Sequence, residues 1–296
     1  MKTVGFIGLG NMGYHMVKNL LLKDYKVHVY DISEKALEEA AKINAVPEKS
    51  IAELSGKVDT IFIMVMNYQQ VKSVVLGEDG VFENANEGST VIVSSTISPE
   101  ETKNLSVIAG QNNLNYMDCP VSGGKDGAIN GTLIMMSACK DEVFESNKEI
   151  LKIIGCHTYH VSEKIGNGQV MKSINQVMIA TGMAIASEAV TMAVKSGLKG
   201  EQIYEVITKC TGCSDVFRDK LPLIMKRDFV PRGPIDIFIK DLSIALDIGK
   251  DVKSPMFVSS IVKQIFTWAS AEGYGQEDLG ALIRAYEDTA GVIVEK

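Results

Sequence analysis

Three short segments of this chain carry groups whose types and spacing could do chemistry. Residues 8–13 form a glycine-rich turn, residues 118–124 combine an aspartate with a serine and two glycines, and residues 168–175 carry a lysine and an asparagine. Groups of these kinds can bind a phosphate, hold a carboxylate and move a proton, respectively. The elements around the three segments decide whether they can act together.

The glycine-rich turn reads Gly8-Leu9-Gly10-Asn11-Met12-Gly13 and stands between the apolar run Val4–Ile7 and an amphipathic stretch over residues 14–22. In such a strand–turn–helix, Gly8 permits the tight turn, Gly10 lets the backbone approach a pyrophosphate, and Gly13 lets helix and strand pack closely. The helix N-terminus then presents N–H groups and the positive end of its dipole to the anion. The segment predicts a dinucleotide site that includes Asn11 and Met12; a merely structural glycine turn is the alternative.

Asp31 ends the next strand-like run, Lys26–Tyr30, roughly the expected 20 residues further on. A carboxylate there accepts hydrogen bonds from the ribose hydroxyls of the adenosine and repels a 2′-phosphate. No arginine follows it, which favours NAD, whereas Lys35 as the only nearby cation leaves NADP open. The alternative role for Asp31 is that of a turn former before Ser33.

The segment Asp118-Cys119-Pro120-Val121-Ser122-Gly123-Gly124 leaves the carboxyl end of a predicted strand, where doubly wound sheets bind their ligands. Ser122, Gly123 and Gly124 offer small, close donors that could hold a substrate carboxylate. Strand-to-loop junctions often contain serine and glycine for structural reasons, so this segment alone is a modest indication.

Lys172 and Asn175 stand three residues apart near the start of a long helical stretch, so both project from one helix face. A lysine placed there can reach a cleft between domains, where desolvation and a bound nicotinamide would lower its pKa and suit it to proton transfer. Taken singly, a solvated surface lysine is the more common arrangement. The same holds for the charged pair Lys240-Asp241, which interrupts an apolar helix.

The pattern of apolar residues predicts an α/β fold with two domains. Up to about residue 161 the chain alternates strands and helices, and the continuous apolar runs of the strands indicate a doubly wound, parallel sheet covered on both faces. After that point the periodicity is helical, beginning with one long helix over residues 166–196. We therefore expect a dinucleotide-binding domain of the Rossmann type at 1–162 and an all-helical substrate and oligomerisation domain at 163–296.

Composition excludes several classes of function. The 296 residues carry a net charge of −7, and no basic run is long enough to follow a nucleic-acid backbone. Five cysteines, an odd number spread over a large chain, are typical of a reducing cytoplasm, and the CxxC spacing of Cys210 and Cys213 is taken as coincidence, with no metal site expected. No signal peptide is expected at the N-terminus. The apolar stretch Ile174–Ala186 is judged too short and too polar to span a membrane.

Taken together, the motifs resemble those of the β-hydroxyacid dehydrogenase family, which includes 3-hydroxyisobutyrate dehydrogenase and tartronate semialdehyde reductase. Over essentially the whole chain, the resemblance rests on the glycine-rich turn, on Ser95–Pro99, on Asp118–Gly124, and on the Gly168, Lys172, Asn175 and Lys240-Asp241-Leu242 positions. Gly127-Ala128 and Gly131-Thr132-Leu133 fit as well.

The resemblance implies a role for each position. Lys172 would transfer the proton and Asn175 would help to position the substrate, whose carboxylate would bind at residues 122–124. Thr96 and Lys240 would lie beside the nicotinamide. Val65 and Met66 would belong to a turn that faces the cofactor, although relatives usually carry a proline where Met66 stands.

The resemblance also implies the reaction. An NAD(P)-dependent oxidoreductase would interconvert a short 3-hydroxyacid, similar to 3-hydroxyisobutyrate, and its semialdehyde by hydride transfer. A reductase of tartronate, glyoxylate or succinic semialdehyde is the alternative, and an imine reductase or a non-catalytic NAD sensor is a more distant one. The partners expected are a small carboxylate substrate and further copies of the chain, as a homodimer or homotetramer, with no nucleic acid or membrane.

Overall fold

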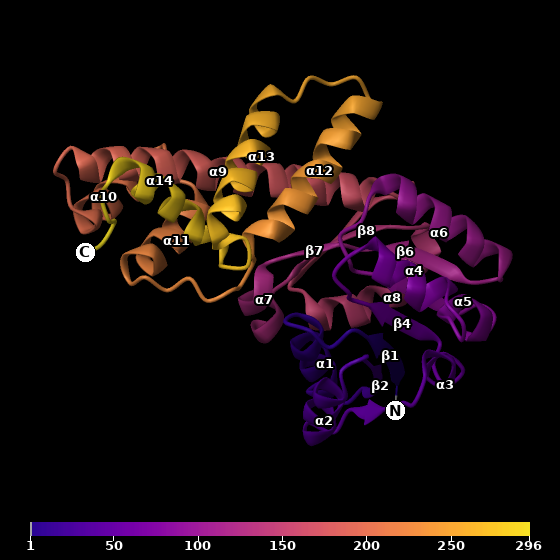
Figure 1. The fold of residues 1–296 in the computed structure, drawn as a ribbon. Helices are drawn as coiled ribbons and strands as arrows, with labels where there is room; N and C mark the ends of the chain where they lie inside the picture. Colours follow the sequence, from indigo (N-terminus) through magenta and orange to yellow (C-terminus); the bar gives the residue numbers. More distant parts are fainter. Residues whose placement is uncertain (1) are drawn as a thin grey trace. The chain divides into compact units, whose positions relative to one another are not determined.

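The computed structural model describes residues 2–296 and divides into two compact units, Met1–Lys172 and Ser173–Lys296. Figure 1 follows the chain from the strands and helices of the first unit to the helices of the second. Helix α9 (Asn167–Lys195) begins in the first unit and continues into the second.

The strands of the first unit form one nine-stranded sheet within the part of the chain that the structure describes. Its order is β3-β2-β1-β4-β5-β6-β8-β7, and β9 pairs with β8. The strands are β1 (Thr3–Ile7), β2 (Lys26–Tyr30), β3 (Val46–Pro47), β4 (Thr60–Ile63), β5 (Thr90–Val93), β6 (Asn115–Asp118), β7 (Val121–Ser122), β8 (Ile134–Ala138) and β9 (His157–Ser162).

Eight helices of the first unit connect these strands. They are α1 (Gly13–Leu21), α2 (Glu34–Lys42), α3 (Ile51–Ser55), α4 (Tyr68–Leu76), α5 (Val81–Asn84), α6 (Pro99–Gln111), α7 (Gly124–Asn130) and α8 (Asp141–Ile154). Several begin at a polar residue whose side chain accepts an N–H of the first turn, as Ser33, Asn67 and Ser98 do. These caps satisfy backbone donors that have no partner within the helix.

Both faces of the sheet are buried, because alternate side chains of one strand enter different cores. Phe6 packs in a cluster with side chains of α1 and α8, whereas its neighbour Ile7 packs in a second cluster with side chains of α4 and α6. This arrangement confirms the prediction of a doubly wound sheet from continuous apolar strands.

The sheet is parallel from β3 to β6, and one edge departs from that pattern. β8 runs antiparallel to β6 and β7, whereas β9 runs parallel to β8. The alternation of strands and helices that the sequence pattern predicts is present throughout this unit. The pattern did not indicate the short elements β3, β7, α5 and α7, which are two to seven residues long.

The second unit is helical throughout, apart from an isolated bridge between Pro234 and Asp278. After α9 it contains α10 (Gly200–Ile207), α11 (Asp215–Met225), α12 (Ile235–Asp251), α13 (Phe257–Ala269), the π-helical η1 (Ser270–Tyr274), the 3₁₀-helical η2 (Leu279–Ala281) and α14 (Leu282–Ala290). The expected all-helical second part is thus confirmed.

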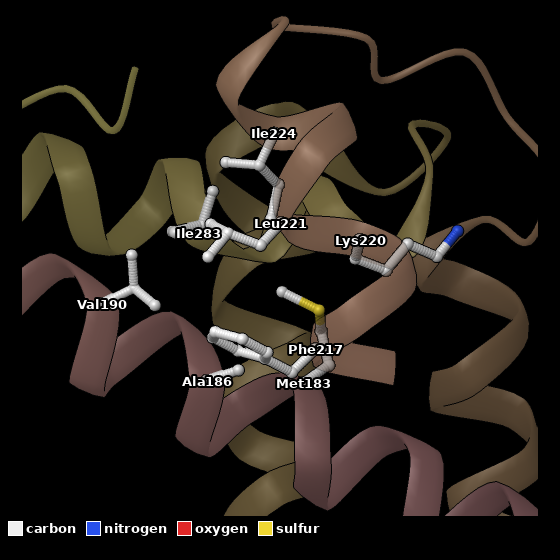
Figure 2. A pocket seen from close by; sticks show the side chains of 8 residues that line it. All are labelled: Met183, Ala186, Val190, Phe217, Lys220, Leu221, Ile224 and Ile283. Carbon is white, nitrogen blue, oxygen red and sulfur yellow. The ribbon is translucent and has the colours of Figure 1, made fainter. Parts of the chain in front are cut away.

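One face of α9 contributes to the core of the second unit. Ala180, Met183 and Val190 pack there against side chains of α11 and α14, such as Phe217 and Ile283. A cavity of about 10 Å³ remains among these side chains, as Figure 2 shows. A volume of that size holds one water molecule at most, so this cavity is a packing gap and not a substrate site.

The apolar stretch Ile174–Ala186 belongs to α9, which is longer and more apolar than that stretch alone indicated. α9 has 29 residues, and its most apolar 18-residue window has a mean hydropathy of 1.7, of which 33% is buried. Length and composition alone would allow this helix to cross a bilayer, although core helices of soluble proteins meet the same criteria.

Candidate active site

The glycine-rich turn between β1 and α1 is shaped by close backbone approaches. Gly8 has φ of +97°, and a Cβ atom there would collide with the carbonyl oxygen of Met64. A Cβ atom on Gly13 would collide with the carbonyl oxygen of Gly8, so the helix and the turn pack as closely as the backbone allows. By contrast, a Cβ atom on Gly10 would meet nothing within 4 Å, which leaves open space beside that peptide.

The N-terminus of α1 is suited to an anion. Met12 at the N-cap provides no side-chain hydrogen bond to the first turn, and the first turn carries no acidic residue. A helix end of this kind offers backbone N–H donors and the positive end of its dipole. Together with the open space at Gly10, these features of the helix start are those that a bound anion requires.

Asp31 ends β2 beside the glycine-rich turn. One carboxylate oxygen accepts a hydrogen bond from the Leu9 N–H at 2.6 Å, and the other accepts one from the Ser33 N–H at 2.8 Å. Asp31 therefore serves as a turn former, as the alternative interpretation holds. The same contacts hold its carboxylate next to the glycine-rich turn, where a ribose would follow the pyrophosphate.

The loops after β4 and β5 are tied together by Ser95. Its Oγ accepts a hydrogen bond from the Val65 N–H at 2.9 Å. Met66 is exposed, and its own N–H donates to the Gln70 side chain at 2.8 Å. A proline at position 66 would lack that donor, so here the methionine permits a hydrogen bond that closes the start of α4. Thr96, half-buried, follows Ser95 directly.

A buried amide and a buried carboxylate join this loop to the start of α9. The Gln169 side chain accepts from the Ile97 N–H at 3.2 Å and donates to the Ser95 carbonyl at 3.1 Å and to Asp118 Oδ1 at 2.7 Å. Asp118 Oδ2 accepts from the backbone N–H groups of Gly166 and Gln169, at 3.1 and 3.2 Å. Gln169 and Asp118 have no exposed surface.

Burial is the main cause of the shifted pKa values of Asp118, Cys119 and Cys139. Desolvation raises the pKa of Asp118 to about 7, although hydrogen bonds from Gln169 and from the backbone oppose the shift. Burial likewise raises the pKa values of the Cys119 and Cys139 thiols to about 12, so both are neutral at physiological pH.

Ser122 ends β7, Gly123 follows it, and Gly124 begins α7. Ser122 is half-buried in β7, whereas the two glycines are exposed and have φ values of +121° and +58°. Such backbone angles strain any residue with a side chain, which explains why glycines occupy both positions.

Lys172 lies on the first turns of α9 and is 8% exposed. The common expectation of a solvated surface lysine is therefore wrong for this residue. Its position follows from helix geometry, because Gln169 and Lys172 are three residues apart and share the buried face of the helix. A buried amine requires a structural or chemical reason, since its burial costs free energy.

In the second unit, a chain of polar contacts connects Asn175 to Lys240. Asn175 donates to Gln176 at 3.1 Å, and Gln176 donates to Asp241 at 2.6 Å. Asp241, which is 2% exposed, forms an ion pair with Lys240 at 3.0 Å. Lys240 is only partly exposed, so the interpretation of Lys240 and Asp241 as a solvated helix edge is wrong.

Other groups that sequence analysis singled out stand apart from these contacts. His160 stacks on Phe144 and bonds to the Cys139 carbonyl, which is a structural role. No cluster of three or more metal-ligating side chains occurs among residues 2–296. A shallow groove of about 350 Å³, lined by Thr3 and Thr60 among others, opens at the amino ends of the strands, whereas doubly wound sheets bind ligands at the carboxyl ends.

Sequence reasoning missed Gln169, Gln176 and the roles of Ser95, Asp118 and Asp241 as hydrogen-bond partners. A signal was present in the helix pattern. Gln169, Lys172 and Gln176 recur at spacings of three and four residues, which places three polar residues on one buried face of an apolar helix.

Comparisons with known proteins match both parts of the chain. A family model described as the NAD binding domain of 6-phosphogluconate dehydrogenase matches residues 3–162. A second, described as the NAD-binding of NADP-dependent 3-hydroxyisobutyrate dehydrogenase, matches residues 166–286.

Individual relatives match over nearly the full length. The chain is 33% identical to an L-threonate dehydrogenase of Cupriavidus necator, over 96% of each chain. It is 34% identical to a 2-(hydroxymethyl)glutarate dehydrogenase of Eubacterium barkeri, over 98% of this chain and 97% of that one. A crystal structure of 3-hydroxyisobutyrate dehydrogenase from Salmonella typhimurium superposes with a TM-score of 0.89 at 32% identity, covering 96% of this chain and 99% of that one.

These matches and the glycine-rich turn define an NAD(P)-binding dehydrogenase that acts on a CH–OH group. The chain belongs to the β-hydroxyacid dehydrogenase family, as its motifs indicated.

Proposed function

We propose that the protein interconverts a short 3-hydroxyacid and its semialdehyde, with Lys172 as the proton donor and acceptor. The observation that carries this proposal is the burial of Lys172, one helical turn beyond the glutamine that holds both neighbours of Thr96. Burial lowers the pKa of an amine towards the range in which it can exchange a proton with a substrate.

The residues divide the work of the reaction. Ser122 and the N–H groups of Gly123 and Gly124 bind the carboxylate and thereby orient the carbinol carbon, and Asn175 helps to hold the substrate. In oxidation the neutral amine of Lys172 accepts the hydroxyl proton; in reduction the ammonium group returns it to the developing alkoxide. The nicotinamide, when bound, accepts or supplies the hydride.

The proposed cofactor contacts comprise the glycine-rich turn, Asp31, the loops after β4 and β5, and Lys240 on α12. Gly8, Gly10, Asn11, Met12 and Gly13 hold the pyrophosphate, and Val65, Met66, Thr96 and Lys240 line the nicotinamide end. The carboxylate of Asp31 favours NAD over NADP, because it would repel a 2′-phosphate. We take residues 1–162 as the dinucleotide-binding domain and 163–296 as the substrate and oligomerisation domain.

Lys125 gives the substrate proposal more detail. This half-buried lysine on α7 follows the proposed carboxylate-binding turn. The pKa of His15 on α1 is lowered first by burial and second by the positive charge of Lys125. Its charge therefore reaches across to α1, where Lys18 adds to it. We infer that this cationic surface recognises a second polar or acidic group of the substrate. The compounds for which two relatives are named, L-threonate and 2-(hydroxymethyl)glutarate, carry such groups.

We further propose a homo-oligomer in the cytoplasm. Ile174, Met178, Ile185 and Met192 are 55–70% exposed and lie on the face of α9 opposite to its buried side chains. A second copy of the chain would cover this apolar face. All five cysteines are free, as is common in a reducing compartment.

A spectrophotometric panel at 340 nm tests the proposed reaction. For reduction it tests methylmalonate semialdehyde, tartronate semialdehyde, succinic semialdehyde and glyoxylate, each with NADH and NADPH. For oxidation it tests L-threonate and 2-(hydroxymethyl)glutarate, each with NAD and NADP. We expect Lys172→Ala to lower kcat about 10²- to 10⁴-fold while nucleotide affinity changes little. Lys164→Ala, which removes an exposed lysine just before α9, is the matched control. Near-normal turnover of Lys172→Ala would exclude the proton role.

A further inference from the structure

The side chain of Gln169 holds the backbone on both sides of Thr96. Its Oε1 accepts the N–H of Ile97, and its Nε2 donates to the carbonyl of Ser95. These are the two peptide groups that flank residue 96, so the amide acts on the loop as a neighbouring β-strand would. The partners lie 72 and 74 residues away along the chain.

Asp118 completes the arrangement from the end of β6. Its Oδ1 accepts the second N–H of the Gln169 amide, and its Oδ2 accepts backbone N–H groups at the first turn of α9. The carboxylate thus caps α9 from another element, since the early N–H groups of a helix have no partner within it. The three bonds of the Gln169 side chain use its amide oxygen and both N–H donors of its NH₂ group.

We propose that Gln169 and Asp118 are a positioning pair that fixes the start of α9, and with it Lys172, to the loop that carries Thr96. The proposal rests on the proposed function in one respect, namely that Lys172 transfers the proton. The pair touches neither substrate nor cofactor in this role; it sets the distance between the amine and the nicotinamide-side loop.

The chemistry of an amide explains why glutamine is required. Leucine has a similar volume but neither accepts from Ile97 nor donates to Ser95. Glutamate keeps the acceptor, loses both donors and places a second carboxylate against Asp118. Each substitution therefore removes hydrogen bonds that join the loop of Thr96, Asp118 and the start of α9, while Lys172 itself is unchanged.

Hydrogen exchange tests the pair without any activity measurement. In Gln169→Leu we expect the amide of Ile97 to exchange at least tenfold faster than in the wild type. Asn147→Leu is the control, because Asn147 is also a buried amide, and it bonds to Thr90 on β5 and not to this loop. Unchanged exchange at residues 95–97 in Gln169→Leu would overturn the proposal, whatever reaction the protein catalyses.

Kinetics tests the consequence for Lys172. We expect Gln169→Leu to lower kcat about 10- to 100-fold, with less than a threefold change in the nucleotide KM, because displacement by about 1 Å costs that much in rate. The primary isotope effect with deuterated nicotinamide cofactor should rise as hydride transfer becomes slower. Asn147→Leu should change thermal stability but neither quantity. Equal kcat in the two variants would overturn the proposal.

Asp118→Asn provides a second variant if Gln169→Leu does not fold. Asparagine has the shape of aspartate and can still accept from the start of α9, yet its amide opposes the Nε2 donor of Gln169. We expect a three- to tenfold loss of kcat and faster exchange at Ile97. Wild-type values for both would contradict the pair.

Discussion

At the scale of single residues, Asp118 carries opposing influences. Its oxygens accept three hydrogen bonds, which favour the charged form, while complete burial favours the neutral form and dominates. The balance raises its pKa from 3.8 to about 7. The neighbouring thiols of Cys119 and Cys139 stay neutral over this range, so Asp118 titrates without them.

This shift predicts how stability depends on pH. Because the folded protein holds the proton more tightly than the unfolded chain, the stabilisation is complete below pH 3.8 and is lost as pH rises through about 7. The free energy of unfolding of the wild type relative to Asp118→Asn should therefore decrease by up to about 1.4 kcal/mol per pH unit between these values. Urea unfolding of both proteins from pH 4.5 to 8 measures it; a constant difference would contradict the prediction.

Lys125 makes the substrate prediction specific. Lys125→Ala should lower kcat/KM about tenfold for substrates with a second carboxylate and less than twofold for those without one, because only the former face its charge. Initial rates with 2-(hydroxymethyl)glutarate and 3-hydroxyisobutyrate give the comparison. Lys23→Ala, an exposed lysine just after α1, is the control. Equal effects on both substrates would remove Lys125 from substrate recognition.

Local residues were the most predictable part of the site. The clash of a Cβ atom on Gly13 with the Gly8 carbonyl lies within one strand–turn–helix, so the spacing of the two glycines predicts it, whereas the contact of Gly8 with Met64 involves the end of another strand, β4. Gln169 could not be predicted in this way, since its partners come from loops far along the chain. The burial of Lys172 was likewise contrary to the usual exposure of lysine, and only the family resemblance indicated it.

At the scale of elements, α6 begins with a capping box that lies directly after the loop of Thr96. The Ser98 side chain accepts from the Glu101 N–H at 3.2 Å, and the Glu101 side chain accepts from the Ser98 N–H at 2.7 Å. Pro99 follows at the first helical position, where its missing donor has no cost. These contacts fix where the loop ends and the helix starts.

Removing this cap should destabilise the protein measurably. Ser98→Ala should lower the free energy of unfolding by about 1 kcal/mol, the usual effect of losing an N-cap hydroxyl. Ser106→Ala, within the same helix, is the control and should be close to neutral, because alanine has the better helix propensity. Urea unfolding at one pH distinguishes the two; equal effects would argue against a role for the cap.

Element limits were most predictable for segments with a clear apolar pattern. Strand β2 occurs at its expected limits, and α9 begins and ends within one residue of the expected 166–196, whereas β7 and α7 were missed. The reversed direction of β8 was also beyond the sequence pattern, since an apolar strand reads the same whether its neighbour is parallel or antiparallel.

At the scale of the whole molecule, the outer face of α9 predicts self-association. Met178, Ile185 and Met192 recur every seven residues and are 58–70% exposed, which is a seam suited to a second helix. The double substitution Met178→Lys and Ile185→Lys should convert an oligomer into a monomer, because it places unpaired charges in the interface between the two helices.

Light scattering coupled to size exclusion gives the masses. Val107→Lys changes a single exposed apolar residue of α6 and is the matched control, which should keep the wild-type mass. A wild-type protein that is monomeric at micromolar concentration would contradict the prediction.

The placement of the Gln169 amide has a consequence for protein engineering. It bonds to the Ser95 carbonyl and the Ile97 N–H, on either side of position 96, and neither bond involves the Thr96 side chain. A library that varies residue 96 alone should therefore retain the shape of its loop. Because we propose that Thr96 lies beside the nicotinamide, selections for altered coenzyme or substrate preference should begin at this position, with Gln169 left intact.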